Sequence, residues 1–239
     1  MKRKSHDASL TAGLVVLAAL AAPASAQDLQ EKVAAARQAA AHNQEALRAY
    51  TWTEKTEISL KGEVKNTSLQ SCRYGPDGKV QKTPLSAPAE QAEASARRGR
   101  KGRVKARVIE KKTGELKEEM QAASSLVHHY VPPSPEKMQA AMAGGRVTIT
   151  PGPGTAGLRI ADYEKAGDSL VLTLDPAAKA MTRIDVDTWL DAPTEKVALD
   201  VEMQSLPDGT SYPGTVVLAI PSSQIQVRIT NSDYQKVAN

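Results

Sequence analysis

The sequence predicts an α+β protein, in which a large, curved antiparallel β-sheet has helices covering its concave face. Three observations support this class. Several stretches alternate between apolar and polar residues with a period of two, which is typical of half-buried strands. The segments between them are short and rich in turn residues, so neighbouring strands should run antiparallel. About eight or nine such strands are expected, against only three or four helices available to cover their apolar faces.

The first 26 residues have the organisation of a cleavable signal peptide. Residues 2–4 are basic, residues 10–22 are largely apolar, and Ala24-Ser25-Ala26 is a small-x-small cleavage site. A membrane anchor is the weaker alternative, because the apolar run is shorter than the roughly 20 residues that cross a bilayer comfortably. We therefore expect cleavage after Ala26, a periplasmic location, and one mature domain over residues 27–239.

The composition argues against some classes of partner. The formal charge is +4, and removing the signal peptide, with three positive residues and one negative, leaves +2. A nearly neutral mature chain gives no reason to expect nucleic acid. Two Trp, six Tyr and no Phe are too few for an aromatic stacking platform. Cys72 is the only cysteine, so no internal disulfide can form, and a buried apolar role is favoured over a reactive thiol or an intermolecular bridge.

The first half of the mature chain should form a helix and then strands. Residues 28–49 are predicted to be helical, with Asp28 as the N-cap. Residues 50–60 alternate with a period of two, and a second strand is expected near 63–74. A short third strand near 79–83 follows the turn signal at residues 75–78. Glu54 falls on the inward side of the first strand, where it would pair with a buried base or cap a cavity mouth, unless the strand end projects into water.

Residues 84–146 are predicted to form a basic helical insertion. Gly114 should interrupt the helical pattern, and a helix over residues 115–129 should follow it. Ser134 is expected to cap a short helix that has Pro135 at its first position and ends at Gly144-Gly145.

The remaining chain is predicted to form a meander. Residues 146–150 are a short strand and residues 151–154 a loop. Five further strands are expected at 169–174, 180–190, 196–204, 211–219 and 224–230. Their inward aliphatic faces should form one continuous concave surface, because consecutive strands joined by short turns lie side by side.

A curled sheet capped by a few helices encloses either a packed core or a ligand cavity. A binding site would use inward side chains of the strands. The predicted ligand contacts are Trp52, Ile58, Ile184, Val186, Leu199, Val201, Leu218 and Val227.

The order of elements resembles that of a known superfamily. An Ala/Gln-rich helix precedes the strand pair from Tyr50-Thr51-Trp52-Thr53-Glu54 to Tyr74. A helical insertion follows, and the chain ends with 168–174, 182–186, 208–213 and Asp233-Tyr234. This is similar to the periplasmic outer-membrane lipoprotein carriers (LolA/LolB-like). The resemblance implies an unclosed β-barrel, or half-barrel, with helices in its mouth and acyl chains bound inside.

The insertion carries an unusual concentration of charge. Residues 97–112 hold nine Lys or Arg against Glu110 alone, a local excess of +8. Arg97, Arg98, Arg100 and Lys101 are the predicted contacts with an anionic membrane surface or another anionic partner. The alternative is a solvated segment without a partner, which Gly99 and Gly102 favour.

No catalytic or metal site is expected. His128 and His129 are adjacent, so their side chains point apart on a helix and lack the i, i+4 spacing of a zinc pair. Ser124 and Ser125 lack the surrounding G-x-S-x-G of a nucleophile elbow. We therefore expect no enzymatic activity and no cofactor.

The leading hypothesis is a periplasmic protein that binds or carries a lipid or an acyl chain. The alternative is an envelope protein-interaction or sensing module without a small ligand. An apolar cavity of roughly 300 Å³ or more would favour the carrier. A filled interior with an exposed apolar patch would favour the interaction module.

Overall fold

The computed structural model describes residues 38–39, 41–85, 100–175, 177–178 and 180–237, with the side chains of residues 100–113 excepted. The predicted signal peptide lies outside these ranges, as does half of the predicted first helix, residues 28–37 and 40. Within them, no helix combines the length and the hydrophobicity that crossing a membrane requires.

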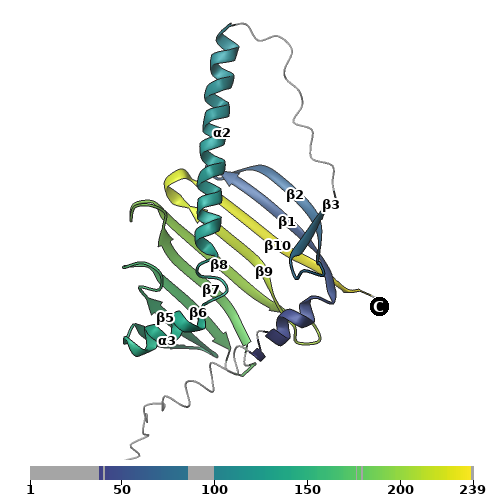
Figure 1. Cartoon of the computed structure of the whole chain (residues 1–239), viewed down its shortest axis with the longest axis vertical. Coiled ribbons are helices and arrows are strands. Elements are labelled where there is room, and N and C mark those ends of the chain that lie inside the picture. Colours follow the sequence, from purple (N-terminus) through teal and green to yellow (C-terminus); the bar gives the residue numbers. More distant parts are fainter. Residues whose placement is uncertain (1–37, 40, 86–99, 176, 179, 238–239) are drawn as a thin grey trace, which may run out of the picture.

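One antiparallel sheet of ten strands dominates the fold (Figure 1). Its strand order is β3-β2-β1-β10-β9-β8-β7-β6-β5-β4. Every neighbouring pair is antiparallel, and β1 lies beside β10, so the first and last strands meet in the middle of the sheet. Among the described residues, β3 and β4 each pair on one side only, and the sheet therefore stays open. The elements are β1 (Tyr50–Leu60), β2 (Glu63–Tyr74), β3 (Val80–Pro84), α2 (Arg100–Val127), α3 (Pro135–Ala143), β4 (Val147–Gly152), β5 (Thr155–Ala161), β6 (Ser169–Asp175), β7 (Ala180–Trp189), β8 (Lys196–Ser205), β9 (Ser211–Ile220), η1 (Pro221–Ser223) and β10 (Ile225–Lys236).

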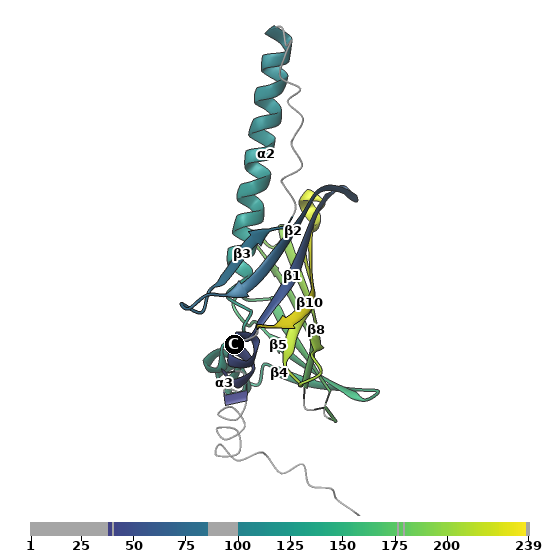
Figure 2. The same ribbon diagram turned by 90° about the vertical axis from the view of Figure 1, so that its right-hand side faces the viewer.

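The sheet curls around the helices. Figure 2 shows α2 and α3 on the same, concave side, with β2 and β3 bending toward them. This arrangement confirms the predicted α+β class and the unclosed half-barrel that the resemblance implies. The curl follows from the right-handed twist that accumulates across a sheet of this size.

Strand β5 was not predicted from the sequence. It pairs with β4 through Ile160 and Val147 and with β6 through Ile160 and Leu170. The predicted loop at residues 151–154 is shorter in the structure, because Pro151 and Gly152 belong to β4, and the turn is made by residues 153–154, where Gly154 adopts a φ of +71°. Gly157, which disfavours strand formation, weakens the local pattern, so pairing on both sides is what keeps this segment extended.

Helix α2 is continuous, and the predicted break at Gly114 is wrong. A single glycine costs a helix about 1 kcal/mol relative to alanine, and a helix of 28 residues tolerates that cost. Its second half packs on the sheet through Leu116, Met120 and Ala123, which contact a cluster around Ile220 and Ile225. Its first half extends well beyond the sheet (Figures 1 and 2).

Helix α3 begins as the sequence predicts. The Ser134 hydroxyl accepts a hydrogen bond from the backbone N–H of Lys137 at 3.3 Å, and Pro135 takes the first position. Ala141 of this helix is fully buried and belongs to the main core, together with Tyr130, Ile160 and Leu170. The core therefore fills the concave face over β5, β6, β7 and β8.

Candidate ligand site on the concave face

The strand register arranges the concave face in cross-strand rows. Directly opposed residues of antiparallel strands point to the same face, so each pairing extends a row by one side chain. One row runs across five strands and contains five predicted contacts: Ile58, Val227, Leu218, Leu199 and Val186.

A second aliphatic row lies beside the first. It contains two further predicted contacts, Val201 and Ile184, and continues through Val216 to Ile229. The structure thus brings seven of the eight predicted residues together on one surface. Their function as ligand contacts stays a prediction.

The segment from the end of α2 through Tyr130 to α3 packs on part of these rows, and we call it the cover. It divides the rows into two parts. Ile184, Val186, Leu199 and Val201 have at most 4% of their surface exposed and belong to the core cluster under Tyr130. Ile58, Leu218 and Val227, like Val216 and Ile229, are only partly buried. The first four side chains are therefore packed within the protein. Val216, Leu218 and Val227 pack against the edges of the two core clusters, and like Ile58 and Ile229 they keep part of their surface exposed.

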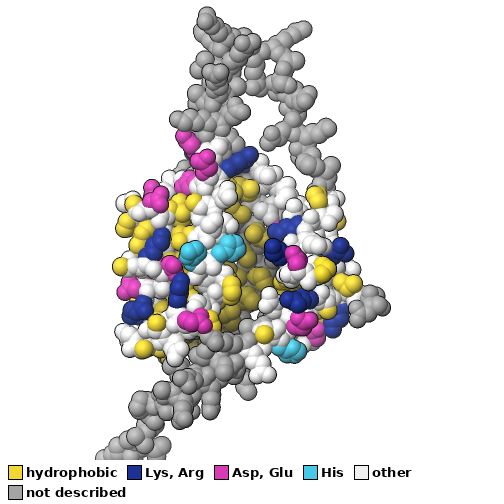
Figure 3. Space-filling view, in the orientation of Figure 1, with side chains coloured by type: hydrophobic (Ala, Val, Ile, Leu, Met, Phe, Trp, Pro, Cys, Tyr) yellow, Lys and Arg dark blue, Asp and Glu magenta, His cyan; other side chains and the backbone are white. Residues whose placement is uncertain are grey.

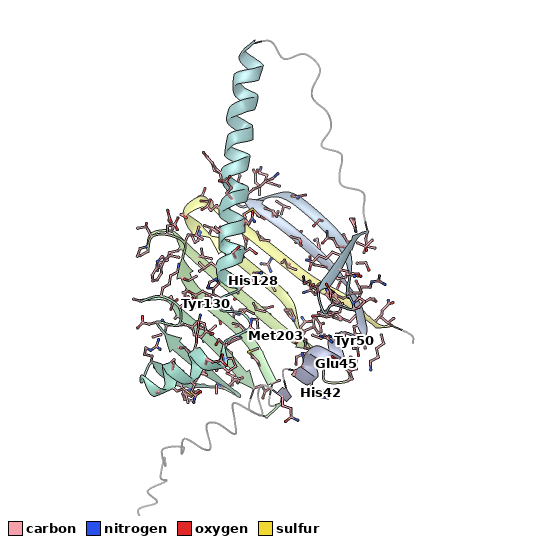
Figure 4. All side chains as sticks on the ribbon, in the orientation of Figure 1. His42, Glu45, Tyr50, His128, Tyr130 and Met203 are labelled. Atoms are coloured by element: carbon pink, nitrogen blue, oxygen red, sulfur yellow. The ribbon has the colours of Figure 1, made fainter. Side chains whose placement is uncertain are left out.

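The accessible part forms a hollow, which is visible in Figure 3. Hydrophobic side chains line it between the end of α2 and the edge formed by β1, β2 and β3. We define the hollow by the partly buried side chains of its floor, Ile58, Val216, Leu218, Val227 and Ile229. Figure 4 shows Met203, also partly buried, between Tyr130 and Tyr50.

Val216 and Ile229 were not among the predicted contacts. The signal was present, because each lies two residues from a predicted contact on the same strand and so faces the same way. The sequence could not show which members of an alternating strand lie under the cover and which do not.

Trp52, the eighth predicted contact, belongs to a separate aromatic cluster. Its ring stacks on Tyr234 at 5.6 Å between centroids and lies 5.4 Å from the ring of Tyr74. Tyr212 contacts Tyr234 at 4.2 Å. Only 8% of the surface of Trp52 is exposed, so this side chain closes one end of the concave face.

A polar row separates the aromatic cluster from the hollow. Glu54 on β1 is opposite Asn231 on β10, and both lie one inward position beyond the row of Ile229. The Glu54 carboxylate is buried and accepts hydrogen bonds from Lys82 Nζ at 2.6 and 2.8 Å. Glu54 therefore does not project into water, and it pairs with a base, but Lys82 is exposed rather than buried as predicted.

Tyr130 ties the cover to the sheet. Its hydroxyl donates to Asp168 Oδ2 at 2.5 Å and lies 2.7 Å from Thr188 Oγ1. Asp168 also accepts backbone N–H bonds from Tyr163 and Lys165 at 2.6 and 2.8 Å. Burial and the neighbouring Asp168 carboxylate raise the pKa of Tyr130 well above its usual value. The network is buried and satisfied, which suits an anchor rather than a reacting group.

The convex face is chemically different. Arg183 pairs with Asp185 and Asp200 there, and the alternate residues of β9 and β10 add Thr215 and Arg228. A depression of about 260 Å³ lies among these polar side chains. Val217 is the one apolar side chain in its lining, so the depression does not offer an extended apolar surface for an acyl chain.

The predicted anionic contacts are only partly placed. Arg97 and Arg98 lie outside the described residues, and Arg100 and Lys101 begin the projecting half of α2, where no side chains are described. Among the described residues, no group of three or more His, Cys, Asp or Glu side chains is arranged to hold a metal ion. His129 Nδ1 lies 3.2 Å from a Glu164 carboxylate oxygen.

Comparison with known proteins concerns the fold. No family model matches the chain, and no curated protein matches it. A DUF1329 family protein from Desulfovibrio piger aligns over 87% of this chain and 94% of its own, with 13% identity and a TM-score of 0.42. A domain from Vibrio parahaemolyticus, described as an outer membrane lipoprotein-sorting protein, aligns over 88% and 94%, with 10% identity and a TM-score of 0.41. Similarity at this level supports no conclusion about ligand or activity.

Proposed function

We propose that this chain is a non-enzymatic periplasmic protein that binds or carries an apolar ligand, a lipid or an acyl chain, in the hollow of its half-barrel. One observation carries the proposal. Five neighbouring aliphatic side chains of the concave floor keep part of their surface exposed inside a curved, sheltered surface, although three of them border the core clusters, while the same rows are fully packed beneath Tyr130.

Exposure of aliphatic surface is unfavourable by about 25 cal/mol per Å². Scattered exposed side chains need no explanation, but adjacent ones gathered in a concavity are typical of ligand sites. The floor is built from opposed pairs such as Val227–Leu218 and Ile229–Val216, so its shape is held by the sheet itself. A ligand chain that lies along it removes apolar area on both partners from water.

The first experiment looks for the ligand and then blocks its site. The mature protein, purified without detergent, should carry lipid or fatty acid detectable by mass spectrometry of an organic extract. Ile229→Glu places a carboxylate in the hollow. The extracted lipid should fall at least tenfold, because burying an unpaired carboxylate against the acyl chain of the ligand costs free energy.

Thr230→Glu is the matched control. It adds the same charge one residue along β10 on the convex face, opposite Lys55. This variant should retain the lipid of the parent protein. Equal lipid content in both variants, or a parent with neither bound lipid nor affinity for an added uncharged lipid such as methyl decanoate, would contradict the carrier function and favour the interaction module.

We also propose that the basic half of α2 contacts an anionic membrane surface. Residues 100–112 hold seven Lys or Arg and one Glu, and this half projects away from the sheet. Such a projection can reach a surface without obstruction by the half-barrel, and clustered basic charge is attracted to anionic head groups.

A further inference from the structure

We propose that the hollow has a polar end at Asn231, Glu54 and Lys82, which selects an amphiphile whose neutral head group carries both an N–H or O–H donor and an oxygen acceptor. A fatty amide is the simplest such molecule. This inference rests on the proposed function, because it assumes that the hollow holds the chain of the ligand, and it adds the chemistry of the head group.

The polar row is well placed for this role. Asn231 and Glu54 are direct cross-strand neighbours, and Ile229 and Thr56 form the next pair toward the hollow. Successive inward positions on a strand lie about 7 Å apart, so a head group at Asn231 leaves its chain over Ile229 and Val227. Further along β10, Ile225 is covered by the cluster that includes Leu116 and Met120 of α2. The hollow is therefore polar at one end and closed by apolar side chains at the other.

Asn231 supplies an acceptor without a partner. Its Nδ2 donates to the backbone carbonyl of Pro213 at 2.8 Å, which fixes the orientation of the amide. Its Oδ1 is buried and has no hydrogen-bond partner among the described residues. A buried oxygen without a donor costs about 1–3 kcal/mol, and such atoms are rare in native proteins. A head group that donates an N–H or O–H would satisfy it.

Glu54 and Lys82 supply the second half of the recognition. The Glu54 carboxylate takes two short contacts with Lys82 Nζ, so the pair is neutral overall. The Lys82 side chain is 42% exposed, against 10% for that of Glu54. An ammonium group has three donors, and the exposed part of Lys82 can donate to an oxygen of the head group. The buried Glu54 carboxylate disfavours a head group that is itself anionic.

The test compares two uncharged ligands with the same chain. Decanamide has both a donor and an acceptor, whereas methyl decanoate has only acceptors. We expect the mature protein to bind the amide about tenfold more tightly by calorimetric titration, as one recovered hydrogen bond to a buried oxygen predicts. Asn231→Leu should abolish this preference and leave the affinity for the ester unchanged.

Thr230→Leu, on the opposite face of the same strand, is the control and should keep the preference. Equal binding of amide and ester by the unmodified protein would contradict head-group selection by the polar end, but it would not contradict binding of the acyl chain in the hollow. Preference that survives Asn231→Leu would overturn it as well. If neither ligand binds, the result would instead contradict the proposed function itself. The comparison on the unmodified protein decides the question even when Asn231→Leu does not fold.

Discussion

Single polar side chains fasten the cover to the half-barrel, and Tyr130 is the clearest case. We expect Tyr130→Phe to lower the free energy of unfolding by about 1–3 kcal/mol, because Thr188 and the buried Asp168 each lose a hydrogen-bond partner. Urea unfolding followed by circular dichroism measures the change. Tyr74→Phe removes a hydroxyl for which the structure shows no hydrogen bond among the described residues. It should change stability far less, and an equal loss in both variants would contradict the anchoring role.

Asp208 makes one contact of the N-terminal strand sensitive to pH. The Tyr50 hydroxyl donates to Asp208 at 2.6 Å, and this bond, followed by those from Thr210 and Lys236, lowers the pKa of Asp208. A carboxyl group with a lowered pKa stabilises the fold above its ordinary titration range. That stability is lost as the pH falls through the pKa of the folded state.

Tyr50→Phe tests this contact. The pKa of Asp208, followed by carboxyl NMR titration, should rise toward its ordinary value, because the largest cause of the shift has been removed. The stability difference between the variant and the parent should be present at neutral pH and should vanish in acid, where Asp208 is protonated in both the folded and unfolded states. A difference that persists unchanged into acid would mean that ring packing, not the carboxylate, is responsible.

Cys72 shows how burial settles a choice that composition leaves open. The side chain is fully buried, and burial raises the pKa of its thiol. The predicted small apolar role is therefore confirmed. It packs on the inward face of β2, directly opposite Trp52.

At the scale of elements, α2 has a removable weakness at Gly114. Gly114 lies inside the helix, and a Cβ at this position would meet no described atom of another element or side chain within 4 Å. Gly114→Ala should therefore raise stability by up to about 1 kcal/mol, since alanine loses less backbone entropy on forming a helix. Thermal unfolding followed at 222 nm measures the change.

Gly145 provides the opposite control at the end of α3. It adopts a φ of +67°, where an L-residue is strained, so Gly145→Ala should destabilise the protein by about 1 kcal/mol. Stabilisation by both substitutions would show that the gain at Gly114 has no connection with helix formation.

At the scale of the whole molecule, the half-barrel and the projecting helix are expected to act on different surfaces. Charge reversal at Arg97, Arg98, Arg100 and Lys101 should abolish co-sedimentation with vesicles of phosphatidylglycerol, because the attraction depends on the sign of this segment. None of the substituted residues belongs to the floor of the hollow, so binding of methyl decanoate should not change. If the charge-reversed variant binds vesicles as well as the parent does, or if the parent does not bind them, the proposed membrane contact is contradicted.

Local patterns predicted most of the elements. Period-two alternation marked β1, β2 and the strands from β6 to β10, because side-chain direction in a strand depends only on its own backbone. The cap of α3 was also correct, since Ser134 and Pro135 act within one turn. Strand β5 and the unbroken α2 were missed, since pairing and length there override weak local signals.

The sequence by itself determined which side chains of each strand face inward, and so it correctly grouped seven of the eight candidate contacts on one surface. Only the tertiary structure decided which of them are core and which line the hollow, because burial depends on where the Tyr130 segment and α3 settle on the sheet. The same holds for the unpartnered oxygen of Asn231. Its surroundings come from Pro213 and Glu54, residues distant in the chain that meet only when β10 inserts between β1 and β9.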